Sequence, residues 1–388
     1  MRRALAIAVT VVLLSLSWAA QGVRADPRSF RLTLVYTYIN QGNRVVTLTE
    51  DDVSMPLFVN NSWVTVYLVR TEPPTRVRRR DGDGNLYIVL RVDRVLRPRE
   101  KAVIKAEYRI LSRERSIPEI SEADSGTLGD ISHDLVEDYC SPAGPWRYDE
   151  WEAVREKALT LKGNETNVLR IVRRFVDWVR EAIEYPKLAR HEVPYYPNVT
   201  LHRAKGDCDD QANLLITMCR AVGIPAYLQL GCVYLRMIGE RTYSLWDGHY
   251  LLKSRYVGWH GWAMVYIPPW GWLPVDLTWR GIGEYSFIEG AAVSYDYTIP
   301  CENVTRTDYI LETLNERDRV RRSDIFIVAE QVMTPLAKDY LTPAGEAFES
   351  VIVPFLVASL MIAVVVAIAV RIVLEGRDEH PTNGLPGR

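Results

Sequence analysis

The hydrophobic pattern of this 388-residue chain changes its period near residue 150. Over residues 30–113, apolar and polar residues alternate in runs rich in aromatic and β-branched side chains, which is typical of half-buried strands. Over residues 151–183, the apolar residues recur at helical spacing instead. The change predicts a β-sandwich domain at residues 26–115, a loop-like linker at 116–148 and a second domain at 149–300.

The predicted second domain mixes helices and strands. After the helices at 151–183, another helix is expected from Asp207 to Gly223, because carboxylates in the first turn favour a helix N-terminus and glycine favours its end. Strand-like runs follow at 226–230, 262–266 and 272–276. These alternating patterns place the chain in the α+β class.

Residues 1–25 have the three parts of a secretory signal in the expected order. Arg2 and Arg3 precede an apolar run from Ala4 to Ala20, and small residues follow before Asp26. The alternative is a buried core helix. The order of the parts favours a signal peptide, either cleaved or retained as an anchor.

A second apolar segment lies near the C-terminus. Residues 351–370 carry no charge, and a helix of that length crosses a bilayer core of about 30 Å. Basic residues follow it at once, so the positive-inside rule predicts a transmembrane helix with residues 371–388 as a cytoplasmic tail. Residues 301–350 are expected to form a juxtamembrane stalk. The chain is thus predicted to be a single-pass cell-membrane protein with residues 26–350 outside the cytoplasm.

Composition narrows the classes of partner and site. Lys and Arg number 47 against 49 Asp and Glu, so the basic field that nucleic-acid binding requires is missing and no nucleic-acid partner is expected. Five cysteines are too few for a disulfide scaffold, and none shows the paired spacing of a zinc site. Asp81 to Asn85 is predicted to be a tight turn, since Val92 stands where a calcium loop needs a glutamate. Neither a metal nor a cofactor is expected.

Cys208 is the candidate nucleophile. It lies at the predicted start of a helix, where backbone N–H groups and the helix dipole lower a thiol pKa. Asp207, Asp209 and Asp210 oppose that lowering, so a thiolate here needs a cationic partner such as histidine. His249 and His260 are the downstream candidates.

His260 is favoured because a hairpin follows it and ends in a carboxylate. If the hairpin pivots on Pro269, Thr278 lies opposite His260 and Asp276 is the diagonal neighbour on the same face. Cys208, His260 and Asp276 then supply a nucleophile, a base and a group that orients the base.

These residues resemble the transglutaminase-like superfamily of thiol enzymes. The resemblance covers about residues 151–279 and rests on three motifs in order: Gly206-Asp207-Cys208-Asp209-Asp210-Gln211-Ala212 with Arg220 to Ala226, then His260-Gly261-Trp262, then Gly271 to Thr278. It implies a papain-like core of helices packed on an antiparallel sheet, with Cys208 as nucleophile, His260 as general base and Asp276 as its orienting partner. Two departures are Gly261, where many members have alanine, and the long stretch between Cys208 and His260.

Alternatives remain for each candidate. Cys208 could pair in a disulfide, although Cys219 is eleven helical positions away, beyond disulfide reach. His260 could be a core histidine and Asp276 a turn residue. The whole fold could be a cell-surface binding module with an idle triad.

The predicted chemistry is attack of the thiol on an amide of a protein or peptide substrate. The tetrahedral oxyanion collapses to a thioester, which water or an amine resolves. If water accepts the acyl group, the protein is a cysteine peptidase or amidase, which we favour. If a lysine amine accepts it, the protein is a cross-linking acyltransferase.

Overall fold

A computed structural model provides the fold. It describes residues 28–113, 119–186, 192–236, 239–279, 283–293 and 300–336. These residues fall in one compact unit, Asp26–Leu336.

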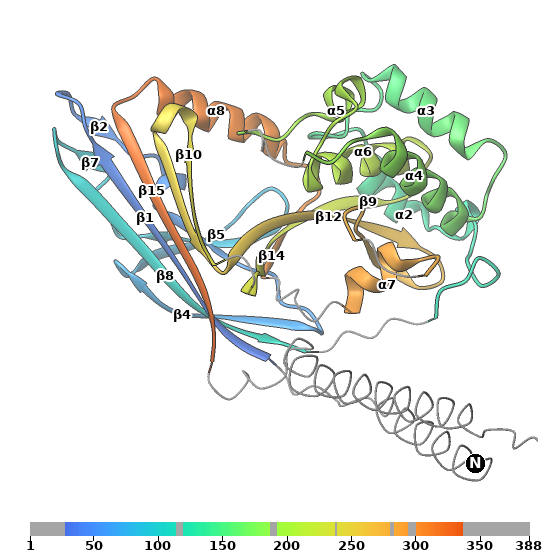
Figure 1. Cartoon of the computed structure of the whole chain (residues 1–388), viewed down its shortest axis with the longest axis horizontal. Coiled ribbons are helices and arrows are strands. Elements are labelled where there is room, and N and C mark those ends of the chain that lie inside the picture. The colour runs from blue at the N-terminus through green and yellow to red at the C-terminus, as the bar shows by residue number, and fades with distance from the viewer. Residues whose placement is uncertain are drawn as a thin grey trace, which may run out of the picture. The chain divides into compact units, whose positions relative to one another are not determined.

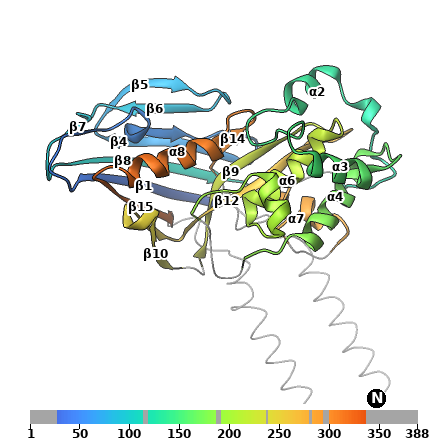
Figure 2. The same ribbon diagram turned by 90° about the horizontal axis from the view of Figure 1, so that it is seen from above.

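The predicted β-sandwich is present. The alternating runs form the strands β1 (Arg28–Asn40), β4 (Val64–Glu72), β6 (Leu86–Leu90) and β8 (Lys101–Ser112). Their alternate side chains, including Leu32, Leu34, Ile104 and Ile110, are fully buried between the sheets. A three-stranded sheet of β3 (Ser54–Leu57), β6 and β5 (Thr75–Arg80) and a two-stranded sheet of β2 (Val46–Thr47) and β7 (Val95–Leu96) complete this part (Figures 1 and 2).

Later parts of the chain extend the large sandwich sheet, whose strand order is β10-β11-β15-β1-β8-β4. The stretch between Cys208 and His260 supplies β10 (Glu240–Leu245) and β11 (Tyr250–Arg255). The strand β15 (Ile325–Pro335) pairs antiparallel with β1 and parallel with β11. In Figure 1, β15 lies between β1 and β10 as a single long strand.

The expected stalk at residues 301–350 is therefore wrong for its described part, residues 301–336. This part forms β14 (Cys301–Val304), α8 (Tyr309–Arg321) and β15, each packed into the folded unit. The reason is that buried residues alternate with partly exposed ones along β15, so its buried face completes the sandwich core. The high local charge lies mainly on α8, whose charged residues are partly or fully exposed.

The second part combines helices with an antiparallel sheet, as predicted. Strands β9 (Ala226–Tyr234), β12 (Val257–Ile267), β13 (Gly271–Val275) and β14 form the order β13-β12-β9-β14. In the hairpin, Ala263 pairs with Val275 and Ile267 with Gly271, which is the predicted register around Pro269. The helices are α2 (His133–Cys140), α3 (Glu152–Lys162), α4 (Val168–Ala182), α5 (Pro197–Arg203), α6 (Cys208–Ala221) and α7 (Ser286–Val293).

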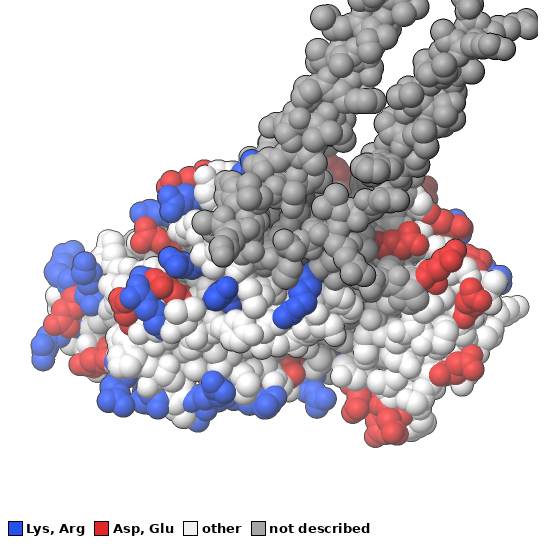
Figure 3. All heavy atoms as spheres, turned by 90° about the horizontal axis from the view of Figure 1, so that it is seen from below, with Lys and Arg blue, Asp and Glu red and all other residues white. Residues whose placement is uncertain are grey.

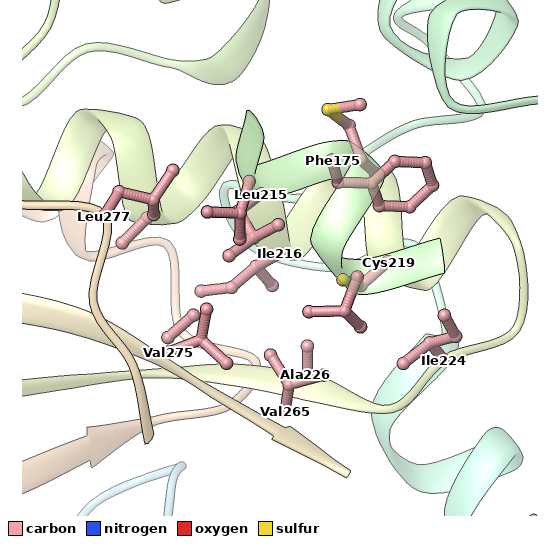
Figure 4. Close-up of a cluster of buried hydrophobic side chains, with 14 of the residues drawn as sticks. Phe175, Leu215, Ile216, Cys219, Ile224, Ala226, Val265, Val275 and Leu277 are labelled. Atoms are coloured by element: carbon pink, nitrogen blue, oxygen red, sulfur yellow. The ribbon is translucent and has the colours of Figure 1, made fainter. Parts of the chain in front are cut away.

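Helix α6 is the centre of the second hydrophobic core. Leu215, Ile216 and Cys219 point from α6 toward Val265 on β12 and Phe175 on α4, and all five side chains are fully buried (Figure 4). Burial of a side chain of the size of Leu, Ile or Phe contributes about 1.5–3 kcal/mol. This packing fixes the position of the α6 N-terminus relative to the end of the hairpin.

The turn at Asp81 to Asn85 is confirmed and joins the two parts. The Oδ1 atom of Asp81 accepts hydrogen bonds from the backbone N–H groups of Asp83 and Asn85. The Oδ1 atom of Asp83 in turn accepts those of Thr305, Arg306 and Thr307. The acidic turn therefore anchors the segment that leads into α8.

The two predicted membrane segments, residues 1–25 and 351–370, lie outside the described residues. Within the described ranges, no helix is long and apolar enough to cross a membrane.

Candidate active site

A groove of about 570 Å³ lies where the N-terminus of α6 meets β9 and β12. Cys208 and His260 both line it, so the structure brings the predicted nucleophile and base to one cavity. Trp259 and Trp279 also line this groove, whereas Trp262 is buried.

Tight packing sets the position of Cys208. It is the first residue of α6, and Asp207 is the N-cap. The Asp210 side chain is fully buried and accepts hydrogen bonds from the backbone N–H groups of Asp207 and Tyr195. A Cβ atom at Gly206 would lie 2.7 Å from the Cβ of Asp210, so only glycine allows this close approach.

The surroundings of Cys208 disfavour ionisation of its thiol. Burial raises the pKa of the Cys208 thiol well above its usual value, and the carboxylates of Asp209 and Asp207 raise it further. A hydrogen bond from the Gly261 backbone acts in the opposite direction. The raised pKa opposes the thiolate that the helix N-terminus was expected to favour. A base such as His260 would therefore have to assist the loss of the Cys208 proton.

A short hydrogen bond joins His260 and Asp276. The Nε2 atom of His260 lies 2.7 Å from Oδ2 of Asp276, and both side chains are largely buried. Burial alone would raise the pKa of Asp276, but the hydrogen bonds from His260 and Thr278 lower it below its usual value. Asp276 is thus a carboxylate that accepts from Nε2–H, which directs the Nδ1 side of the imidazole away from Asp276.

Thr278 and Arg180 hold the segment that carries Asp276. The N–H group and the hydroxyl of Thr278 both donate to Oδ1 of Asp276, at 2.9 and 2.7 Å. The Arg180 guanidinium, from α4, donates to the carbonyl oxygens of Leu277, Asp276 and Trp279. The sequence placed Thr278 opposite His260, but Arg180 carried no signal because its partners are backbone atoms almost a hundred residues away.

Gly261 connects β12 to the nucleophile. Its backbone hydrogen bond reaches the Cys208 thiol, so the residue next to His260 contacts the nucleophile directly. A Cβ at position 261 would lie 2.8 Å from the Cβ of Asp209. The glycine at this position thus provides the space that Asp209 occupies.

The contact between Asp209 and Tyr309 was not expected from the sequence. Asp209 lines the groove, and its Oδ2 atom accepts a hydrogen bond from the Tyr309 hydroxyl, which lies on α8. Tyr309 belongs to the segment expected to be a stalk, so no local pattern could place it here. Asp207, Cys208 and Asp209 also offer three potential metal-ligand atoms within 4.8 Å of one another. One of the three is the nucleophilic sulfur.

The alternatives for the three candidate residues can be compared with these contacts. All five cysteines lie in the described ranges and none is in a disulfide, so Cys208 has no covalent partner there. His260 borders the groove instead of lying wholly in the core. Asp276 is bonded to His260 and is more than a turn residue. The geometry brings together a thiol, an imidazole and a carboxylate, which is the set of groups that thiol-dependent acyl transfer uses.

Comparisons with known proteins give one family. Residues 155–277 match the profile of the Transglutaminase-like superfamily. A search of curated proteins gave no significant match.

Solved structures with a similar chain course share little sequence with this chain. A candidate cysteine protease from Cytophaga hutchinsonii is 15% identical, with 80% of this chain and 90% of that chain covered and a TM-score of 0.46. The periplasmic domain of TgpA from Pseudomonas aeruginosa is 14% identical, with 66% and 89% covered and a TM-score of 0.35. LapG from Legionella pneumophila is 15% identical, with 50% and 98% covered and a TM-score of 0.27.

Proposed function

Because residues 155–277 belong to the transglutaminase-like superfamily, we propose that this protein is a thiol enzyme that cleaves amide bonds of proteins or peptides. The observation that carries the proposal is the His260–Asp276 hydrogen bond of 2.7 Å at the edge of the groove that contains Cys208. The most direct reading is a cysteine peptidase or amidase, because water suffices as the acceptor.

In the first step, His260 removes the Cys208 proton as the sulfur attacks the amide carbonyl carbon. The C–S bond forms, and the carbonyl oxygen becomes an oxyanion near the backbone N–H groups at the start of α6. Asp276 stabilises the imidazolium that results, since its carboxylate accepts from Nε2.

In the second step, His260 returns the proton to the leaving amine, and the C–N bond breaks to give a thioester on Cys208. His260 then takes a proton from water as the water attacks, and Cys208 leaves as the thiol once the proton is returned. Every group in the cycle ends in its starting state, and no other reactant is needed.

A fluorogenic peptide library tests the proposal. The full-length protein is incubated with the library, with and without an added primary amine, beside a Cys208→Ala variant. Hydrolysis by the wild type that the variant lacks is the expected result. If no peptide or glutamine donor turns over, and a cell-surface ligand binds both proteins equally, the enzyme assignment is overturned in favour of a binding module.

We further propose that the enzyme is a single-pass membrane protein with its groove outside the cytoplasm. The support is the apolar segment at residues 351–370, the basic residues after it and the signal-like residues 1–25. Protease added to intact cells is expected to degrade residues 26–336. Complete protection of this part would contradict the proposed topology.

A further inference from the structure

The described lining of the groove is acidic. Glu192, Asp207 and Asp209 contribute carboxylates, and the lining residues within the described ranges include no Lys or Arg. Figure 3 shows the same bias on one face of the molecule, where Asp and Glu gather over the end that carries the helices and Lys and Arg over the sandwich end. A substrate that enters this groove meets negative charge next to the nucleophile.

Asp209 is the carboxylate closest to the reacting sulfur. Its Oδ1 atom lies 3.9 Å from Sγ of Cys208. A substrate carbonyl carbon bonded to that sulfur would therefore lie beside Oδ1. Any group recognised by Oδ1 must be within one or two atoms of the reacting carbonyl.

A chain of hydrogen bonds fixes the other oxygen of Asp209. Its Oδ2 accepts from the Tyr309 hydroxyl at 3.1 Å, and that hydroxyl accepts from Nδ2 of Asn213 at 2.6 Å. The Oδ1 atom of Asn213 accepts in turn from the indole N–H of Trp146, and both of these side chains are fully buried. The carboxylate is thus held in one orientation by three elements of the fold.

A cation bound to Asp209 would stabilise its ionised form. Burial and the neighbouring Asp207 raise the pKa of Asp209 to about 7. No Lys or Arg of the described chain forms an ion pair with it. Gly261 makes the room for it, since a Cβ there would lie 2.8 Å from the Cβ of Asp209.

We propose that Asp209 is a specificity-determining residue that binds a protonated primary amine of the substrate directly beside the reacting carbonyl. The inference rests on the proposed function. In the acyl-enzyme of an N-terminal residue, only the carbonyl carbon and the α-carbon separate the α-ammonium from Sγ. That spacing matches the 3.9 Å between Sγ and Oδ1.

The ammonium group that Asp209 binds could also belong to a second substrate, the amine that accepts the acyl group. Here Asp209 first binds the acceptor as its ammonium form and takes one proton from it. The neutral nitrogen attacks the thioester carbonyl, a C–N bond forms, the C–S bond breaks, and the sulfur leaves with the second proton by way of His260. The first source makes the enzyme selective for free N-termini, and the second makes it an amine acyltransferase.

Two peptide amides that differ only in a free or an acetylated N-terminus separate the sources. The full-length protein is assayed on each, with and without cadaverine, at neutral pH. If Asp209 binds the substrate's N-terminus, a charge-assisted hydrogen bond should give at least about tenfold higher kcat/KM for the peptide with the free N-terminus. If it binds the acceptor amine, the acetylated peptide should form the cadaverine amide with saturation kinetics.

Asp209→Asn, which keeps the shape and removes the charge, should lower that preference, or raise the KM for cadaverine, by about tenfold. Asp209→Glu should keep part of it. Glu302→Gln is the matched control, because Glu302 is a carboxyl whose pKa burial also raises to about 7 but which lines a different cavity. This control should leave the preference unchanged.

Equal turnover of both peptides without an amine product would overturn this inference and leave the proposed function standing. An equal loss on both peptides in Asp209→Asn, with the ratio unchanged, would also overturn it, since that marks a positioning role. If the wild type turns over neither peptide and no library member, the proposed function and this inference fail together.

Discussion

The carboxyl groups at the two walls of the groove have pKa values shifted in opposite directions. On the strand wall, formed by His260 and Thr278 with their buried hydrogen-bond partner Asp276, hydrogen bonds reach both oxygens of Asp276 and lower its pKa in spite of burial. On the helix wall, formed by Asp207, Cys208 and Asp209, burial and mutual repulsion raise the pKa of Asp209 to about 7. The strand wall therefore keeps a carboxylate that can stabilise an imidazolium, while the helix wall disfavours negative charge on Cys208 and Asp209.

The contrast implies a division of labour. The proposed proton transfer depends on the strand wall, where His260 has a fixed carboxylate partner. The proposed recognition of an amine depends on the helix wall, where a cation would offset the repulsion between the carboxylates. Variants of each wall test the division.

The largest effect is expected from removal of the nucleophile or the base. Cys208→Ala and His260→Ala should each lower kcat by about 10⁴-fold or more, because each removes a participant in bond making. Steady-state kinetics with a library-selected peptide measures the loss. Thermal melting should show both variants folded, and substantial turnover by either one would contradict their assigned roles.

A smaller loss is expected from the support of the base. Asp276→Asn should lower kcat by about 10²- to 10⁴-fold, because the amide holds the imidazole less well and carries no charge to stabilise its protonated form. Thr278→Val removes one hydrogen bond to Oδ1 and should lower kcat by less, about three- to tenfold. Thr278→Ser, which keeps the hydroxyl, is the matched control, and an equal loss in both Thr278 variants would refute the positioning role.

The helix wall should control the pH at which Cys208 reacts. Because the thiol pKa is raised, alkylation by iodoacetamide should accelerate as pH rises beyond the usual thiol range of about 8.5. Asp209→Asn removes a negative neighbour and should shift this profile to lower pH by about one unit. Peptide mapping should identify Cys208 as the first site, since the other four cysteines are buried. An unshifted profile would show that Asp209 does not act on the sulfur.

The smallest and most diagnostic effect is on stability. The raised pKa of Asp209 means that the folded state binds more protons than the unfolded state between about pH 4 and 7, so this carboxyl costs stability as pH rises through that window. The free energy of unfolding of Asp209→Asn, measured relative to that of the wild type at the same pH, should therefore be higher at pH 8 than at pH 5. The expected increase is on the order of 1–3 kcal/mol.

Asp276 should show the opposite sign. Its lowered pKa contributes stability that is present above its usual value of 3.8 and is lost as pH falls further. Asp276→Asn should thus lose stability at neutral pH and converge with the wild type in acid. Urea unfolding of both variants across this pH range measures the difference, and parallel pH profiles for the two would contradict the contrast between the walls.

The residues of the strand wall could be predicted from the sequence more completely than the environment of the helix wall. The alternation of β12 and β13 and the Pro268-Pro269 turn determine which residues face His260, so the register could be predicted from local pattern. The helix start at Cys208 was likewise local. The pKa of the Cys208 thiol could not be predicted from local pattern. It depends on burial against β12 and on Asp209, whose partner Tyr309 comes from α8.

The same distinction applies to the fold. Strands β1, β4, β6 and β8 follow from their alternation, but the pairing of β15 with β1 joins residues about 300 positions apart. High charge density along 301–336 suggested a solvated stalk, whereas β15 buries alternate residues along its length and α8 buries Ile310 and Val320. Pairing over such distances leaves no local signature in a single sequence.

Trapping the acyl-enzyme tests the central claim most directly. A rapidly acylating peptide ester is mixed with the full-length protein, the reaction is stopped in acid, and the intact mass and peptide map are measured. The account predicts a mass increase equal to the acyl group, located on Cys208, absent in Cys208→Ala and released on return to neutral pH only when His260 is present. An adduct on another residue, or full turnover of the ester by Cys208→Ala, would contradict it.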